Sequence, residues 1–317
     1  MSEALEPQRR YDHALHGITP GWWRGALAIV CFVVLFFGIS TVLSGIAIIV
    51  ETLAGTITPE QLASGIVPLT PLVLLATNVG LALMIPVAMG LQWAFFGVRP
   101  RWIWSVTGRL RWGWLGRLAL VIVPFWVLYV AGSFALAPEG GFTVDGTVIA
   151  VVAVIVLTTP LQAAGEEVGM RGLVQRSVGS WFPSPRAAFF VSTAVSAVVF
   201  GLAHFAGDPW LIAYYVLFGV AMSVAAHATG GLEAPILIHT VNNLLLLLLA
   251  AFAGQLGEGI DRSAGAGGPF ILLPIAVVLA GAGIAWWWGR RNRVVVTAPP
   301  PPSHYTVPRA VDAEPAG

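Results

Sequence analysis

The sequence predicts an all-α, polytopic integral membrane protein with about eight transmembrane helices and a polar site inside the membrane. Of its 317 residues, 57% are hydrophobic and 10% are charged, whereas roughly 25% of an ordinary soluble domain is charged. The mean hydropathy is +0.83. A soluble fold of this size cannot hide so much apolar surface, and the same composition excludes intrinsic disorder of the whole chain.

Eight stretches without Asp, Glu, Lys or Arg predict the membrane helices, and each is about 20 residues or longer. They are residues 25–50, 61–98, 118–138, 146–165, 187–207, 209–232, 234–257 and 263–289. A helix of about 20 apolar residues crosses the roughly 30 Å hydrocarbon core of a bilayer. The stretches are continuously apolar and do not alternate as barrel strands do, so helices are predicted.

These stretches divide the chain into five parts. They are a cytoplasmic N-terminal tail (1–22), membrane helices one to three with a basic amphipathic loop at 93–117 (23–146), a core that carries the polar motifs (147–250), the last membrane helix (251–289) and a Pro-rich, disordered cytoplasmic tail (290–317).

The arginines set the expected orientation. All 16 basic residues are arginine, and with a cytoplasmic N-terminus only Arg262 falls outside. Because cytoplasmic loops are enriched in basic residues, we expect a multi-pass protein of the cell membrane with both termini cytoplasmic. The net charge of +1 gives no reason to expect nucleic acid as a partner. The single cysteine, Cys31, excludes an internal disulfide framework and a multi-cysteine zinc site.

Three polar motifs interrupt the apolar core. They are Glu166-Glu167-Val168-Gly169-Met170-Arg171, Phe200-Gly201-Leu202-Ala203-His204 and His239-Thr240-Val241-Asn242-Asn243. A charged group at mid-membrane costs about 2.5–3.5 kcal/mol on insertion scales and is a functional candidate by default.

The first motif predicts two acids with different roles. Glu167 and Arg171 are spaced i and i+4 and can pair along one helix face. Glu166 points about 100° away, without such a partner. We therefore expect a structural carboxylate at Glu167 and a working one at Glu166. In the alternative interpretation both acids merely cap the cytoplasmic edge of the fourth span.

The other two motifs supply imidazole and amide groups. His239 and Asn243 share a helix face and can jointly hold a water, a metal or a carbonyl oxygen, and Asn242 could replace Asn243. Polar side chains also serve as interhelical contacts in membranes, and an isolated His204 is more often a packed histidine. Hydrolysis requires a base and donors for a developing oxyanion. Glu166 can supply the base, and Asn243 and the histidines can supply the donors.

In order and spacing the three motifs resemble the CAAX protease and bacteriocin-processing family of intramembrane endopeptidases. The resemblance covers roughly residues 147–250. It implies an all-helical fold with a cavity in the membrane, in which Glu166 activates water. In that family pattern Glu167 and Arg171 would support Glu166. His204, His239 and Asn243 would hold the water, any metal and the oxyanion. The expected substrate is a membrane-associated peptide or protein.

The predicted spans conflict with this site in depth. Taken literally, Glu166 lies near the inner end of the fourth span and His204 near the outer end of the fifth, about 25 Å apart in depth. A single helix over 147–178, kinked at Pro160, would carry Glu166 toward mid-membrane. A submerged turn at Gly207-Asp208-Pro209 would help further.

Two questions stay open at this level. His204 and His239, with Glu167 or Glu166 as third ligand, fit a catalytic zinc, and a metal-free site fits equally well. The same residues also suit a catalytically silent scaffold or bacteriocin-immunity factor of the same fold. A transporter is a third class, although no internal repeat supports it.

Overall fold

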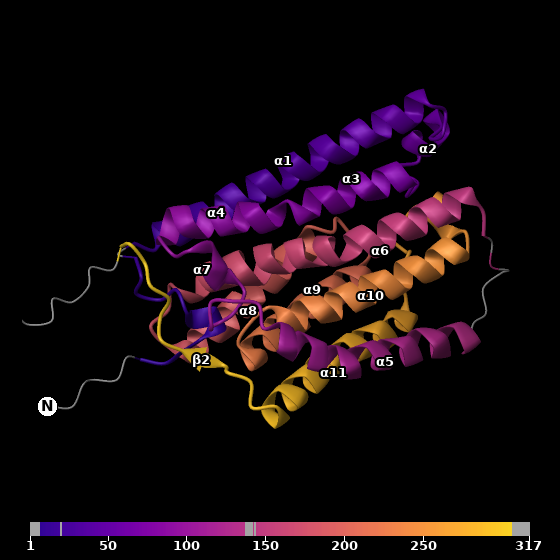
Figure 1. The fold of residues 1–317 in the computed structure, drawn as a ribbon. Helices are drawn as coiled ribbons and strands as arrows, with labels where there is room; N and C mark the ends of the chain where they lie inside the picture. Colours follow the sequence, from indigo (N-terminus) through magenta and orange to yellow (C-terminus); the bar gives the residue numbers. More distant parts are fainter. Residues whose placement is uncertain (1–6, 20, 137–141, 143, 306–317) are drawn as a thin grey trace, which may run out of the picture.

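The computed structural model describes residues 7–19, 21–136, 142 and 144–305, which form a bundle of long helices (Figure 1). In chain order the α-helices are α1 (Trp23–Leu53), α2 (Pro59–Ala63), α3 (Pro71–Ala82), α4 (Met84–Phe96), α5 (Trp112–Leu136), α6 (Gly146–Glu167), α7 (Arg176–Gly179), α8 (Pro185–Leu202), α9 (Pro209–Thr229), α10 (Glu233–Phe252) and α11 (Leu272–Arg291). A π-helix, Val168–Gln175, joins α6 to α7.

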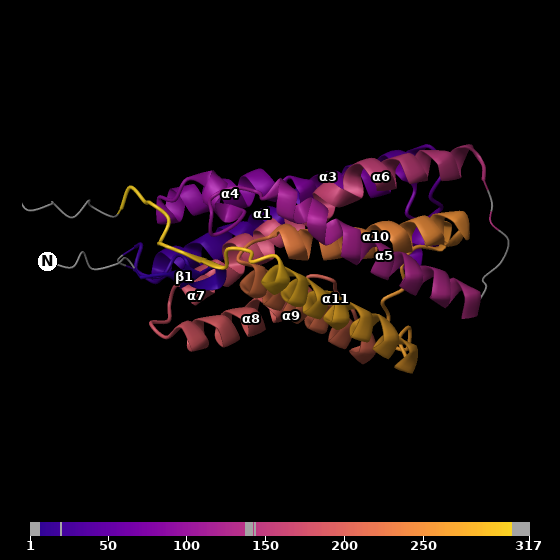
Figure 2. The ribbon, with the colours of Figure 1, turned by 60° about the horizontal axis from the view of Figure 1, so that its bottom comes forward.

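The described residues contain eight helical segments that are long and apolar enough to cross a membrane, which confirms the predicted fold class. The second segment joins α3 to α4, and the fourth runs unbroken over Gly146–Gly179, through α6, the π-helix and α7. In two views related by a 60° turn the helices run roughly along one common direction (Figures 1 and 2).

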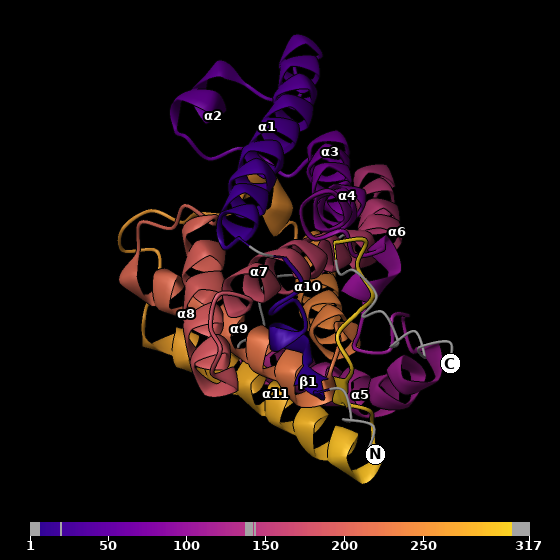
Figure 3. The ribbon, with the colours of Figure 1, turned by 90° about the vertical axis from the view of Figure 1, so that its left-hand side faces the viewer.

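Each apolar helix buries one stripe and leaves the remainder exposed to the membrane. In α1 the stripe is Ala28, Phe32 and Phe36, spaced four residues apart on one face. Val34, between them in sequence, is 64% exposed. Seen almost end-on, α1 lies at one edge of the bundle and α11 at the other (Figure 3). The lipid therefore covers apolar surface that would face water in a soluble protein.

The two predicted tails are packed together. Arg9–Arg10 (β1) pairs antiparallel with Thr297–Ala298 (β2), and Tyr11 is 1% exposed. The Ser303 hydroxyl donates to the Phe96 carbonyl at 2.6 Å. The predicted disorder is therefore wrong for residues 290–305, because backbone pairing and burial hold them. Residues 306–317 lie outside the described part of the chain.

The predicted basic loop between α4 and α5 packs against the rest of the bundle. Between α4 and α5 the chain makes a short 3-10 turn, Pro100–Ile103, and Ser105 forms a β-bridge with Gly231. Ile103 is fully buried. The segment is therefore a packed loop that covers the start of α10.

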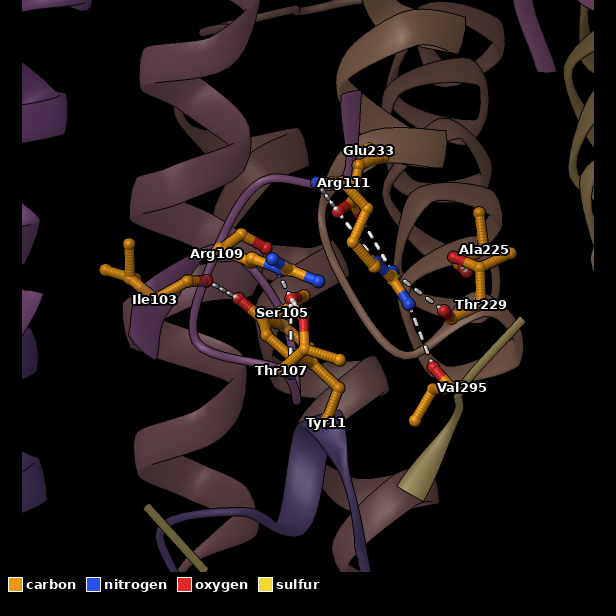
Figure 4. A network of polar contacts seen from close by, with 10 residues as sticks. All are labelled: Tyr11, Ile103, Ser105, Thr107, Arg109, Arg111, Ala225, Thr229, Glu233 and Val295. Atoms are coloured by element: carbon orange, nitrogen blue, oxygen red, sulfur yellow. Dashed lines mark hydrogen bonds and ion pairs between the residues drawn. The ribbon is translucent and has the colours of Figure 1, made fainter. Parts of the chain in front are cut away.

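One arginine ties this loop to three other segments (Figure 4). Arg111 donates to both carboxylate oxygens of Glu233, at 2.8 and 2.6 Å. It also donates to the carbonyls of Thr229 and Val295, each at 2.9 Å. Glu233 is completely buried and begins α10. The clamp therefore fixes the end of α9, the start of α10 and the segment after α11.

Paired cysteines test the orientation. In a Cys31→Ser background we expect Ala264→Cys, in an exposed position before α11, to react with an impermeant thiol reagent in intact cells. Arg186→Cys, in an exposed position at the start of α8, should react only after the membrane is opened. Ser105 is a poor labelling position because it is 1% exposed. Labelling of Arg186→Cys in intact cells would overturn the cytoplasmic assignment of both termini.

Candidate active site

The three motifs come together where α6, α8 and α10 meet. Glu166 and Glu167 are the last two residues of α6, and Arg171 lies in the π-helix that follows. His204 follows the end of α8, in the turn before α9. His239 lies in the second turn of α10.

Unequal helix lengths resolve the depth conflict. The fourth span has 34 residues and is about 51 Å long at 1.5 Å per residue. The α8 helix has 18 residues, about 27 Å by the same rule. Glu166 thus lies well inside the long span, while the shorter α8 ends at a depth where His204 can approach it. The predicted single helix over 147–178 is formed, with Pro160 inside α6.

Glycines allow the close packing around the two acids. A methyl group at Gly165 would overlap the carbonyl oxygen of Leu81, and one at Gly169 would overlap the ring of Phe32. The two glycines are four residues apart, which is the spacing of small residues at close helix contacts in membranes. They bring the helix that carries Glu166 and Glu167 against α3 and α1. The four-residue spacing of Gly165 and Gly169 is visible in the sequence, although small residues are common there and do not by themselves predict a close contact.

Glu167 forms the i, i+4 ion pair with Arg171 that the spacing predicted. Its Oε1 accepts from Arg171 Nη1 at 3.1 Å and from His239 Nδ1 at 2.8 Å. Arg171 Nη2 donates to the Gly219 carbonyl at 3.0 Å, and its guanidinium lies 4.6 Å from the ring centroid of Phe200. Glu167 and Arg171 are both fully buried, so the pair joins α6, the π-helix, α9 and α10.

One imidazole bridges the two acids. His239 Nε2 lies 3.2 Å from Glu166 Oε2, while Nδ1 contacts Glu167. Since carboxylate oxygens only accept when ionised, both ring nitrogens donate and the imidazole is cationic. Two carboxylates then balance one guanidinium and one imidazolium, so the cluster of Glu166, Glu167, Arg171 and His239 carries no net charge. This balance is what burial in an apolar medium requires.

His204 approaches Glu166 from the end of α8. An electrostatic interaction links the two groups. His204 Nδ1 donates to the Phe200 carbonyl at 2.8 Å, which leaves Nε2 free to accept when the ring is neutral. The ring stacks on Tyr215 at a centroid distance of 3.9 Å. The next residue, Phe205, has φ of 51°, a left-handed conformation that is costly for a bulky residue and often marks functional segments.

The amides form a second polar group beside the acids. Asn243 Nδ2 donates to Gln162 Oε1 at 3.2 Å, and Gln162 lies one helical turn before Glu166. Asn242 instead donates to the Tyr214 hydroxyl at 3.3 Å and accepts from Trp126. Asn243 is therefore the amide on the α6 side, as the sequence favoured. Gln162 was missed because a single glutamine in a membrane helix is unremarkable, although its i, i+4 relation to Glu166 was visible.

A resident zinc does not fit the side chains as they are placed. In the part of the chain that the structure describes, no group of three His, Cys, Asp or Glu side chains could hold a metal ion. The two nitrogens of His239 are each within hydrogen-bond distance of a carboxylate, and a nitrogen that donates a proton has no lone pair for a metal. The zinc that the sequence allowed would need a rearranged His239.

His227 lies outside this cluster. Its Nδ1 contacts Asp12 Oδ1 at 2.6 Å, which joins the N-terminal segment to the last turn of α9. It therefore takes part in holding the packed N-terminal segment.

Comparison with known proteins agrees with the arrangement of the motifs. Residues 147–245 match the family of type II CAAX prenyl endopeptidase Rce1-like proteins. This region contains all three motifs, and it is similar to the CAAX protease family, as their order predicted. No curated protein and no solved structure matches the chain.

Removing the shared carboxylate should destabilise the protein. In Glu167→Gln the buried cations Arg171 and His239 lose a negative partner, and an unpaired buried charge typically costs about 3–5 kcal/mol. We expect a clearly lower thermal unfolding temperature and a lower yield in detergent. The matched change Glu258→Gln, at an exposed loop position, should leave both unchanged. Normal stability of Glu167→Gln would show that this ion cluster does not hold the bundle together.

Proposed function

We propose that the protein is an intramembrane endopeptidase that hydrolyses peptide bonds of membrane-associated substrates. One observation carries the proposal: a buried carboxylate, Glu166, lies 3.2 Å from an imidazole inside a membrane helix, in a region that matches a family of prenyl endopeptidases. An ionisable group kept at this depth is costly without a function.

In the proposed reaction Glu166 acts as general base. It takes a proton from a water molecule, and the water oxygen attacks the scissile carbonyl carbon. The carbonyl oxygen becomes an oxyanion. The Asn243 amide stabilises it together with the His239 Nε2–H, which Glu166 releases on taking the proton, while the free nitrogen of His204 orients the water. Glu166 then returns its proton to the amine as the C–N bond breaks. Water is consumed, and an acid and an amine are formed.

Glu167 and Arg171 act through His239 in this scheme. Because Glu167 holds Nδ1 of the ring, Nε2 is directed toward Glu166. The ring edge also packs against Phe218, at a centroid distance of 4.8 Å. The imidazole is therefore oriented before substrate arrives, which is the condition under which a donor contributes most to an oxyanion.

A catalytically silent scaffold or immunity factor is the second candidate. The specific observation in its favour is that the polar groups are paired and enclosed. Glu166 is 8% exposed and His239 is 3% exposed, so substrate reaches them only after a rearrangement of the helices. The endopeptidase requires Glu166 for cleavage, whereas the scaffold requires it for structure alone.

Cleavage of a membrane-peptide library separates them. With purified protein in a bilayer we expect Glu166→Gln to lower cleavage at least ~100-fold, the usual contribution of a general base or more. Its thermal stability should fall far less than that of Glu167→Gln, since Arg171 keeps its partner. Glu258→Gln serves as the control with full activity. Absence of cleavage by the wild-type protein from a library that includes prenylated C-terminal peptides would favour the scaffold.

Metal analysis of the active protein tests the zinc hypothesis. From the placement of His239 we expect chelator-washed protein to retain full activity with well under one metal per chain. Activity lost to chelator, restored by zinc, and not restored in a His204→Ala, His239→Ala double variant would show that the side chains rearrange around a metal.

A further inference from the structure

A basic cavity lies at the end of the bundle where α5 begins and α11 ends. Its volume is about 530 Å³, and it opens between the loop before α5 and the residues after α11. The side chains that matter for its chemistry are Arg109, Arg111, Trp112, Trp114, Arg117 and Arg293. It is separate from the proposed active site, which lies within α6, α8 and α10.

The cavity carries an excess of positive charge. Arg111 is neutralised by Glu233, but among the described residues Arg109, Arg117 and Arg293 have no ion pair, and all three are exposed. No Asp or Glu is among the residues that line the cavity. Three unbalanced guanidinium groups around one opening select an anion, and the planar fork of arginine suits phosphate.

The backbone around the cavity is already fixed. Arg111 is held by its four contacts to α10, α9 and Val295 (Figure 4). The Trp288 indole donates to the Arg117 carbonyl at 3.1 Å, which links α11 to α5. Arg293 has φ of 53°, in the left-handed position after a helix end where glycine is usual. An arginine at this strained position is unfavourable for folding alone, so its side chain indicates a role in the cavity.

The surroundings indicate a lipid as the source of the phosphate. Trp112 and Trp114 line the cavity, and tryptophan is enriched at the headgroup level of membranes. Beyond Arg117 the outer face of α5 continues into Leu120, which is 76% exposed and apolar. A molecule bound here would place a phosphate among arginines and hydrocarbon against α5.

We propose that this cavity binds the phosphate headgroup of an anionic phospholipid. Basic pockets between membrane helices on the cytoplasmic side bind such headgroups, and the positive-inside rule predicts that side for fifteen of the 16 arginines. The lipid would bridge α5 and α11 beside the clamp that fixes α10.

Lipid binding to the purified full-length protein tests the proposal. Bound lipid is measured by native mass spectrometry and by thermal unfolding during titration with phosphatidylglycerol, phosphatidylcholine with the same acyl chains, or soluble glycerol phosphate. Wild type should bind phosphatidylglycerol well above the other two. A triple variant, Arg109→Gln, Arg117→Gln and Arg293→Gly, should bind it about 100-fold more weakly, at about fivefold per arginine.

Controls make the outcome decisive. The triple variant Arg186→Gln, Arg290→Gln and Arg291→Gln removes the same charge from exposed positions at the same end of the bundle, and should keep binding within about threefold. The single variant Arg293→Gly suits the left-handed backbone, so it should fold at least as well as wild type and still bind about fivefold more weakly. Equal losses in both triple variants, equal binding of the two lipids, or equal affinity for glycerol phosphate would each overturn the proposal.

Discussion

One carboxylate oxygen, Oε1 of Glu167, organises the centre of the bundle. It accepts from Arg171 at 3.1 Å and from His239 at 2.8 Å, and both side chains are buried. Without it, two positive charges would lie unpaired among apolar helices, which is strongly unfavourable. With the Glu167 carboxylate present, the two acids balance the charges of Arg171 and His239. The same carboxylate fixes the orientation of the His239 ring. The proposed chemistry at Glu166 therefore depends on a neighbour that does not react.

Helix length is the second constraint on the site. The 34-residue span that carries the acids passes beside an 18-residue α8, so the turn after α8 brings His204 to the depth of the acids. Asp208 caps α9 at this turn, accepting from the backbone of Trp210 at 2.8 Å, and its other oxygen accepts from Gly265. The turn is thereby joined to the loop before α11. Glycines at 165 and 169 let the acid-bearing helix approach its neighbours closely.

The arginine-rich end of the molecule has a different organisation. Some of the arginines there are paired, as Arg111 is with Glu233, and others are exposed around the basic cavity. The terminal segments also pack there, through β1 and β2. The start of α10, which carries His239, is held from this end by Arg111. The proposed catalytic centre and the arginine-rich end are therefore connected through α10, although their chemistry is separate.

The sequence by itself determined the fold class, the eight spans and the three motifs, because charge is so costly in a membrane that its placement marks both helix ends and functional groups. It also predicted the pairing of Glu167 with Arg171, since the i, i+4 spacing is a local property. Only the tertiary structure decided that His239 bridges both acids, that Gln162 holds Asn243, and that residues 290–305 pack against the body. These are contacts between segments far apart in the chain, and they depend on relative helix depth and close approach, which no local pattern records.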